Sequence, residues 1–384
     1  MKPQKNMGRW ETAGRALIVL GLLFLFLVGI KGLGAGFKLL GKDLLDSFFV
    51  ATKNPFIGLM VGVVTTTLLQ SSSVSTSMIV GLVAAPENPL PLANAIPMIM
   101  GANIGTTVTN TVVSLGHMNR KDEFLRAFSV ATCHDFFNYL TVIILLPLEM
   151  ATGIMEKTAI ILTDLLAGGT SGGGMDYDSP LKGAIKLALA PVKALSEALF
   201  DSSKGQAVVM IGASGVLIFV ALLFVVKVMR SLMQAKVENI VRRSLGSNAL
   251  LAMIVGAMAT VMVQSSSITT SLLVPLAGAG LINLAGAFPV TLGANIGTTV
   301  TALVASMGAS GPNAQLGITI ALVHLLFNVG GILLIYPVPK LRNIPLQGAE
   351  ALARAAIKSK KSALLYIVGM FYIVPMLLIF LTKL

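Results

Sequence analysis

The hydrophobic pattern of the chain consists of long apolar segments separated by short polar ones. A helix needs about 20 consecutive apolar residues to cross the hydrocarbon core of a bilayer. Seven segments meet this requirement: Ala13–Lys31, Ala93–Leu115, Ala127–Ala151, Gln206–Met229, Ala285–Met307, Gln315–Tyr336 and Ala363–Leu381. The pattern therefore predicts an all-α polytopic membrane protein with about seven full spans.

Two further apolar stretches, Phe56–Ala85 and Ala249–Ile282, are each interrupted near the middle by the sequence Gln-Ser-Ser-Ser. A polar break at membrane depth is tolerated only where protein or a water-filled cavity surrounds it. Each stretch is therefore expected to enter the membrane, turn, and leave on the same side. We interpret both as re-entrant helical hairpins and not as full spans.

Three landmarks of the sequence occur twice, in the same order and roughly 190 residues apart. The matching segments are Leu69–Ser77 with Val263–Ser271, Gly101–Thr109 with the identical Gly293–Thr301, and His134–Asn138 with His324–Asn328. Each copy holds one span, one hairpin and two spans, which makes three crossings. Because three is odd, the second copy is expected to be inverted in the membrane, with the two hairpins entering from opposite faces.

The repeat divides the chain into four predicted parts. Residues 1–152 form the first repeat, with its hairpin at 56–85, and residues 206–340 form the second, with its hairpin at 249–282. Between them, residues 153–205 are expected to be an external linker. It contains the glycine-rich run Gly168–Gly174 and an interfacial helix at Leu181–Phe200. Residues 341–384 are expected to form an amphipathic inner segment and a final span.

Composition and charge support this topology. Hydrophobic residues make up 55% of the chain and charged residues only 11%, whereas about 25% is usual in soluble proteins. The net charge of +12 does not indicate a nucleic-acid partner, since no soluble region is large enough to present a basic face. With the N-terminus cytoplasmic, most of the 28 Lys and Arg residues fall on inner segments, as membrane insertion favours.

This charge distribution predicts a multi-pass protein of the plasma membrane or a bacterial inner membrane, surrounded by lipid, with a cytoplasmic N-terminus and an external C-terminus. Whether it forms a homodimer is left open by the sequence. Cys133 is the single cysteine, and there are only three histidines. A disulfide scaffold, a transition-metal site and an organic cofactor are therefore not expected.

The two Gln-Ser-Ser-Ser breaks carry the chemistry of an anion site. A helix that starts after the break, from Val74 onward and from Ile268 onward, has free backbone N–H groups and the positive end of its dipole at its first turn. Serine hydroxyls add neutral donors. Two such ends facing each other are suited to bind an oxyanion without a lysine or arginine.

The same repeated segments carry neutral oxygen ligands of the kind that hard cations prefer. The candidates are Asn103, Thr106, Asn138, Asn295, Thr298 and Asn328. Asp135 is the one acidic residue within these repeated segments, and its repeat counterpart is Leu325. Because a proton relay needs a chain of acids, this composition favours sodium as the coupling ion, with Asp135 as a ligand. A local pair between Asp135 and His134 is the alternative interpretation.

The chain resembles the type II sodium/phosphate cotransporters. The resemblance rests on the paired Gln-Ser-Ser-Ser motifs, the segment 101–111, Arg126-Ala127-Phe128, His134–Asn138 and Leu145–Glu149. It implies sodium-coupled import of inorganic phosphate by alternating access, with no enzymatic activity. It also implies that the phosphate site is formed by Gln70, Ser71, Ser72, Ser73, Gln264, Ser265, Ser266 and Ser267.

The resemblance further implies that Asp135 makes transport electrogenic through an additional sodium ion, and that Asn138 and Thr298 bind sodium. Three other interpretations of the sequence stay open at this point. One is a sodium-coupled symporter for another tetrahedral oxyanion, such as sulfate or arsenate. The second is an intramembrane serine hydrolase using Ser72 with His134 or His324, although it lacks a nucleophile elbow. The third is a passive channel.

Overall fold

The computed structural model describes residues 9–40, 49–166, 180–244, 248–309 and 311–381. These residues form helices, and no strand occurs among them. Within these ranges, six helical segments are long and apolar enough to cross a membrane: Ala13–Leu39, Lys121–Thr152, Ser203–Met233, Leu284–Ser306, Ala314–Ile335 and Lys360–Leu381. The chain is therefore an all-α polytopic membrane protein, and these six segments coincide with six of the seven predicted spans.

The remaining predicted span, Ala93–Leu115, is not one continuous helix. It is divided into α5 (Leu92–Gly105) and α6 (Val108–Ser114), with a short 3-10 turn after α6. The identical nine-residue segment in the second half lies within the unbroken helix α13 (Leu284–Ser306). The prediction of a single helix here was wrong, and the local sequence does not explain the break because it is the same in both halves.

Both stretches that were predicted to break at Gln-Ser-Ser-Ser do so. The first forms α3 (Pro55–Leu69) and α4 (Ser72–Val83), and the second forms α11 (Ala249–Val263) and α12 (Ser266–Gly278). Gln70 and Gln264 end the first arms with φ values of 53° and 55°. This left-handed conformation is uncommon for residues other than glycine, and it stops the helix at the same position in each half.

The other helices complete the bundle. They are α1 (Arg9–Leu40), α7 (Lys121–Thr152), α8 (Ile154–Leu166), α9 (Pro180–Leu199), α10 (Ser203–Ser244), α14 (Ala314–Ile335), α15 (Pro339–Lys358), α16 (Lys360–Val368) and α17 (Val374–Leu381). A π-helical turn, Gly369–Ile373, joins α16 to α17. Helix α9 matches the helix predicted at Leu181–Phe200, whereas α8 was not predicted. The glycine run at 168–174 lies outside the described residues.

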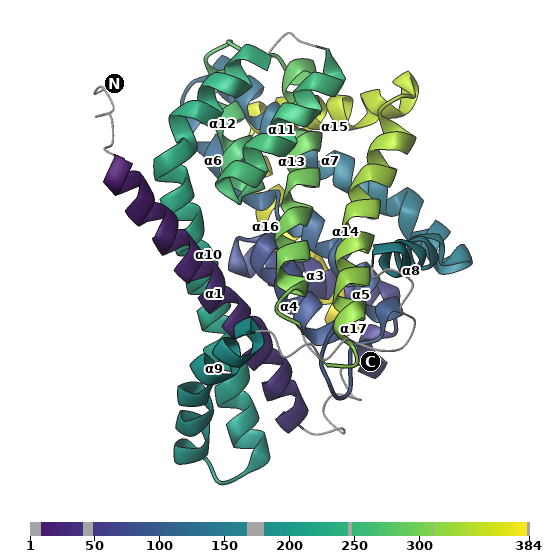
Figure 1. Cartoon of the computed structure of the whole chain (residues 1–384). Coiled ribbons are helices and arrows are strands. Elements are labelled where there is room, and N and C mark those ends of the chain that lie inside the picture. The colour runs from purple at the N-terminus through teal and green to yellow at the C-terminus, as the bar shows by residue number, and fades with distance from the viewer. Residues whose placement is uncertain (1–8, 41–48, 167–179, 245–247, 310, 382–384) are drawn as a thin grey trace.

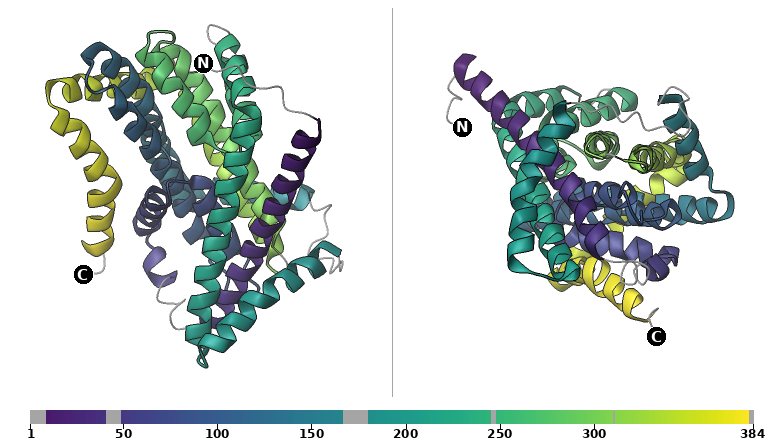
Figure 2. Two further views of the ribbon diagram at one scale, coloured as in Figure 1. Left: turned by 90° about the vertical axis from the view of Figure 1, so that its left-hand side faces the viewer. Right: turned by 60° about the horizontal axis from the view of Figure 1, so that its bottom comes forward.

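The second arm of each broken helix pair packs against the opposite half of the chain. Helix α4 contacts α13 and α14, while α12 contacts α6 and α7 (Figure 1). Helices α1 and α10 lie along each other, and the final span stands at the outer edge of the bundle (Figure 2). Each half therefore contributes a helix, beginning directly after its break, that packs against the other half.

The first arm of each broken pair packs closely against the helix that comes after the pair, because glycines lie at the contact. A Cβ atom added at Gly101 would overlap the carbonyl of Leu59, and one added at Gly293 would overlap the carbonyl of Met253. Helices α3 and α5, and likewise α11 and α13, therefore touch through their backbones. Such contacts hold membrane helices together by van der Waals packing, since there is little hydrophobic driving force in lipid.

Replacing Gly101 or Gly293 with alanine should lower thermal stability, because the methyl group would push two helix backbones apart. Overpacking of this kind costs about 1–3 kcal/mol. The measurement is the temperature at which half of the detergent-solubilised protein stays monodisperse on a sizing column. Gly212→Ala on α10 is the matched control, because a Cβ there meets nothing within 4 Å. Equal stability of Gly101→Ala and Gly212→Ala would contradict the close contact.

Candidate anion and cation sites

The first serine of each triplet caps the helix that follows it. Ser71 is the N-cap of α4 and accepts a hydrogen bond from the Val74 N–H at 3.4 Å, and Ser265 accepts one from the Ile268 N–H at 3.3 Å. The extended backbone of both caps turns the chain into the new helix. The sequence Gln-Ser-Ser-Ser therefore encodes a helix stop followed directly by a helix start.

The side chains of the two glutamines stabilise the breaks through hydrogen bonds. Gln70 donates from Nε2 to the Thr67 carbonyl at 2.7 Å, and its Oε1 accepts from the Thr109 hydroxyl at 3.1 Å. Gln264 makes the equivalent bonds, to the Val261 carbonyl at 2.8 Å and from the Thr301 hydroxyl at 3.2 Å. Each glutamine thus satisfies a helix-end carbonyl and ties its break to the neighbouring helix, a structural role that its motif alone did not predict.

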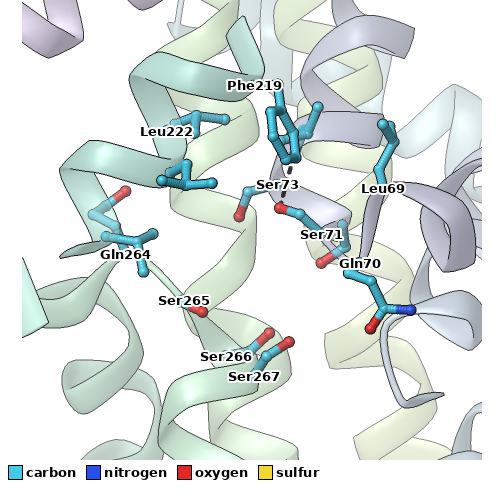
Figure 3. Close-up of a pocket in the computed structure, with 14 residues that line it drawn as sticks. Leu69, Gln70, Ser71, Ser73, Phe219, Leu222, Gln264, Ser265, Ser266 and Ser267 are labelled. Atoms are coloured by element: carbon cyan, nitrogen blue, oxygen red, sulfur yellow. Dashed lines mark hydrogen bonds between the residues drawn. The ribbon is translucent and has the colours of Figure 1, made fainter. Parts of the chain in front are cut away.

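Both breaks line one pocket of about 240 Å³. Apolar side chains of α10, among them Phe219 and Leu222, form another part of its wall. In Figure 3 the labelled serines of the two triplets lie around the same space, and the two glutamine side chains lie on its flanks. The lining residues are Leu69, Gln70, Ser71, Ser72, Ser73, Val74, Phe219, Leu222, Leu223, Val226, Gln264, Ser265, Ser266 and Ser267. All eight residues predicted to bind the anion therefore lie at one pocket, and none of its lining side chains is charged.

The pocket can bind an anion through neutral donors. The first-turn N–H groups of Ser72, Ser73, Ser266 and Ser267 have no acceptor within their helices, as in any α-helix. The dipoles of α4 and α12 both place partial positive charge here. Ser75, Thr76 and Ser77 instead bond back to carbonyls of α4. The available donors are thus concentrated in the two triplets.

Four of the predicted sodium ligands form one buried network across the two halves. His134 Nε2 and Asn295 Oδ1 are 2.7 Å apart, and His324 Nε2 and Asn103 Oδ1 are 3.2 Å apart. His134 is equivalent to His324 in the repeat, and Asn295 is equivalent to Asn103. The two contacts are therefore the same pair with the halves exchanged. The remaining bonds join Asn295 to Asn138 Oδ1 at 3.1 Å, Asn138 to the Asn103 carbonyl at 2.7 Å, and Asn328 to Asn103 Oδ1 at 3.2 Å.

The other three predicted ligands lie outside this hydrogen-bond network. The hydroxyls of Thr106 and Thr298 donate to carbonyls of their own helices, at Ala102 and Ala294. Asp135 is fully buried on α7, and its Oδ2 accepts from the Tyr366 hydroxyl at 2.7 Å. The alternative pairing of Asp135 with His134 is not formed, because His134 bonds to Asn295 instead.

Sequence reasoning missed two kinds of site residue. His134 and His324 were assigned mainly to packing, yet each joins the halves through an asparagine. The sequence signal for this role was that the two histidines occupy equivalent positions in the two repeats. Tyr366 lies on the final span, outside the repeat, so no pattern in the sequence connected it with Asp135.

The hydrolase interpretation is not supported by the geometry. Ser72 lines the pocket, but neither His134 nor His324 is among the lining residues. A Ser-His nucleophile needs a direct hydrogen bond between the two side chains. Both histidines instead direct Nε2 to an asparagine.

Comparison with known proteins identifies the family. The family described as Na+/Pi-cotransporter matches residues 25–152 and 217–345. The chain belongs to the Na+/Pi-cotransporter family. It is 32% identical to sodium-dependent phosphate transport protein 2B of Homo sapiens and of Pongo abelii, in each case over 96% of this chain and 65% of the relative. It is 33% identical to protein 2A of Rattus norvegicus, over 94% of this chain and 66% of the relative.

The two matched ranges of this Na+/Pi-cotransporter family member contain both Gln-Ser-Ser-Ser motifs and the His-Asn network, whereas Tyr366 lies beyond them. The chain spans just under two thirds of the length of the 2B relatives that it matches. No solved structure matches it.

The His134–Asn295 contact can be measured with a double-mutant cycle. His134→Ala and Asn295→Ala should each lower thermal stability, because each leaves a buried polar group without a partner at a cost of about 1–3 kcal/mol. The double variant should be less destabilised than the sum of the two, with a coupling of about 1 kcal/mol. Additive losses would contradict a direct bond. His117→Ala with Asn295→Ala is the non-contacting control pair and should be additive.

Proposed function

We propose that this protein imports inorganic phosphate together with sodium ions, as a secondary-active symporter and not as an enzyme. The observation that carries the proposal is the single uncharged pocket lined by both Gln-Ser-Ser-Ser motifs. Membership of the Na+/Pi-cotransporter family supports it, as do relatives described as sodium-dependent phosphate transport proteins.

A phosphate site without lysine or arginine suits a carrier that must release its substrate. A fixed buried cation would be left unpaired after phosphate leaves, which costs several kcal/mol. Sodium ions that arrive and depart with phosphate avoid this cost. The proposed phosphate ligands are Gln70, Ser71, Ser72, Ser73, Gln264, Ser265, Ser266 and Ser267. The proposed sodium ligands are Asn103, Thr106, Asp135, Asn138, Asn295, Thr298 and Asn328.

We further propose that residues 1–152 and 206–340 are inverted repeats that work by alternating access, with residues 153–205 as the external linker. The exchanged His-Asn pairs support this relation, since each asparagine bonds the histidine of the other half. The packing of α4 and α12 on opposite halves supports it as well. In such carriers two related halves move around a central site, which is exposed alternately to each side.

Asp135 is proposed to make transport electrogenic by binding an additional sodium ion. Moving one net charge through a membrane potential of 100 mV supplies about 2.3 kcal/mol. That energy corresponds to a roughly fifty-fold gradient of substrate. The proposed location is the plasma membrane or a bacterial inner membrane, with the N-terminus inside and the C-terminus outside.

Radiolabelled phosphate uptake into proteoliposomes tests the proposal. Uptake should require an inward sodium gradient and should disappear when choline replaces sodium. Ser72→Ala and Ser266→Ala should each weaken phosphate affinity about 10- to 100-fold, since each removes a hydroxyl donor to a charged ligand. Ser77→Ala is the control, because that buried hydroxyl bonds to the Ser73 carbonyl within α4.

Uptake that is equal with and without sodium would overturn the coupling. Competition by unlabelled sulfate or arsenate tests the choice of substrate. If either anion is transported in preference to phosphate, the protein is a symporter for another tetrahedral oxyanion.

Asp135→Gly should retain phosphate uptake but lose the accompanying inward current, because the additional sodium loses its charged ligand. The ratio of charge to phosphate, measured on solid-supported membranes together with tracer flux, should fall to near zero. Leu325→Gly, at the repeat-equivalent position, is the control and should keep the current. An unchanged ratio in Asp135→Gly would contradict the proposed role.

A further inference from the structure

The final span contacts Asp135, the fully buried carboxylate of α7. The hydroxyl of Tyr366 on α16 donates a hydrogen bond to Asp135 Oδ2 at 2.7 Å, and the hydroxyl of Thr111 on α6 lies 3.5 Å from the same oxygen. Helix α16 is outside both repeats and beyond the residues that match the family. Tyr366, which lies outside the repeat, therefore donates to Asp135, a carboxylate that has no counterpart in the second repeat.

The surroundings of Asp135 neutralise its charge only in part. The hydroxyls of Tyr366 and Thr111 that approach Oδ2 are neutral donors, and Oδ1 is buried without a hydrogen-bond partner among the described residues. An ionised carboxylate in an apolar interior is stable only when it is paired and fully hydrogen-bonded. With Oδ2 engaged by Tyr366, the oxygen left for a cation is Oδ1.

Packing holds the Tyr366 ring in a fixed position. Its ring stacks on Phe136 with centroids 6.5 Å apart and an interplanar angle of 12°, and it meets the edge of Phe371 at 6.0 Å. Phe136 follows Asp135 directly on α7, so one residue stacks on the ring and the residue before it accepts the hydrogen bond of the ring's hydroxyl. The packed ring therefore directs its hydroxyl at one carboxylate oxygen.

The final span also reaches the first broken helix pair. The π-helical turn Gly369–Ile373 and α17 both contact α3, the arm that ends at Gln70. Turns of π-helix inside α-helices occur frequently at functional sites. One span thus connects the carboxylate with the arm that leads to the anion pocket.

We propose that Tyr366 is a positioning residue for the sodium ion at Asp135. By binding Oδ2, it fixes the orientation of the carboxylate so that Oδ1 faces the cation, and it thereby sets sodium affinity and the charge moved per phosphate. This inference rests on the proposed function, because it assigns a residue to the cation side of that symport. Tyr366 itself does not need to touch the ion.

Tyr366→Phe tests the inference, since it keeps the stacked ring and removes only the hydroxyl. The apparent sodium constant should rise about three- to tenfold, which is less than the loss of a direct hydrogen bond to a charged ligand would cause, because Tyr366 acts on the ion only through the carboxylate. The charge moved per phosphate should fall, while the apparent phosphate constant at saturating sodium stays unchanged. A residue with a purely structural role would lower the maximal rate and leave the sodium constant and the charge ratio as they are.

Two controls tie the effect to Asp135. Tyr372→Phe changes another tyrosine of the same span and should behave as the wild type. In an Asp135→Gly background, Tyr366→Phe should have no further effect on the sodium constant, because its target is absent. If Tyr366→Phe is poorly folded, Thr111→Val removes the second donor to Oδ2 and should shift the sodium constant in the same direction by less.

Sodium binding measured without transport separates this inference from the proposed function. Purified wild-type protein should be thermally stabilised by sodium relative to choline, and Tyr366→Phe should need several-fold more sodium for the same stabilisation. If wild-type uptake depends on sodium but Tyr366→Phe matches the wild type in both assays, the inference fails and the proposed function stands. If sodium neither drives uptake nor stabilises the wild type, both fail.

Discussion

A helix that is interrupted inside a bilayer leaves backbone groups without partners, and the organisation of this protein depends on how those groups are satisfied. At each break, a glutamine in the left-handed conformation binds a carbonyl of the ending helix, while a serine caps the starting helix. Thr109 and Thr301 hold the glutamines from the neighbouring helices. What remains unsatisfied is a set of hydroxyl and N–H donors in the next two residues, and these donors face one pocket.

In the described part of the chain, buried neutral polar contacts join the two halves, and the Arg126 guanidinium adds hydrogen bonds to the Ala277 and Gly278 carbonyls of α12. The His134–Asn295 and His324–Asn103 pairs cross between the halves in a buried region, where a fixed charge would cost several kcal/mol. Close glycine contacts at Gly101 and Gly293 hold α3 against α5 and α11 against α13. Such contacts are individually modest, so a bundle built from them is compatible with the movement that the proposed alternating access requires.

Departures from the repeat gather in one place. Asn110 bonds Thr270 and Ser271 on α12, and Thr111 faces Asp135, whereas the equivalent positions in the second half are Ala302 and Leu303. These polar contacts belong to α6, which is the helix that separates from α5. The asymmetric carboxylate, the helix break and the contact with the final span are thus parts of one region, consistent with a cation site that has no symmetric twin.

The sequence by itself determined the membrane class, six of the spans and the position of both helix breaks, because apolar length and local capping act between residues that are close along the chain. The eight residues at the pocket come from segments about 190 positions apart, and they were inferred from the internal repeat and the family resemblance. The sequence did not determine the break between α5 and α6, since the same nine residues form a continuous helix at 293–301. Nor did it reveal that Tyr366 meets Asp135 or that the histidines bond across the halves. Those features arise from contacts between residues more than 150 positions apart, and only the packing of the folded chain selects such partners.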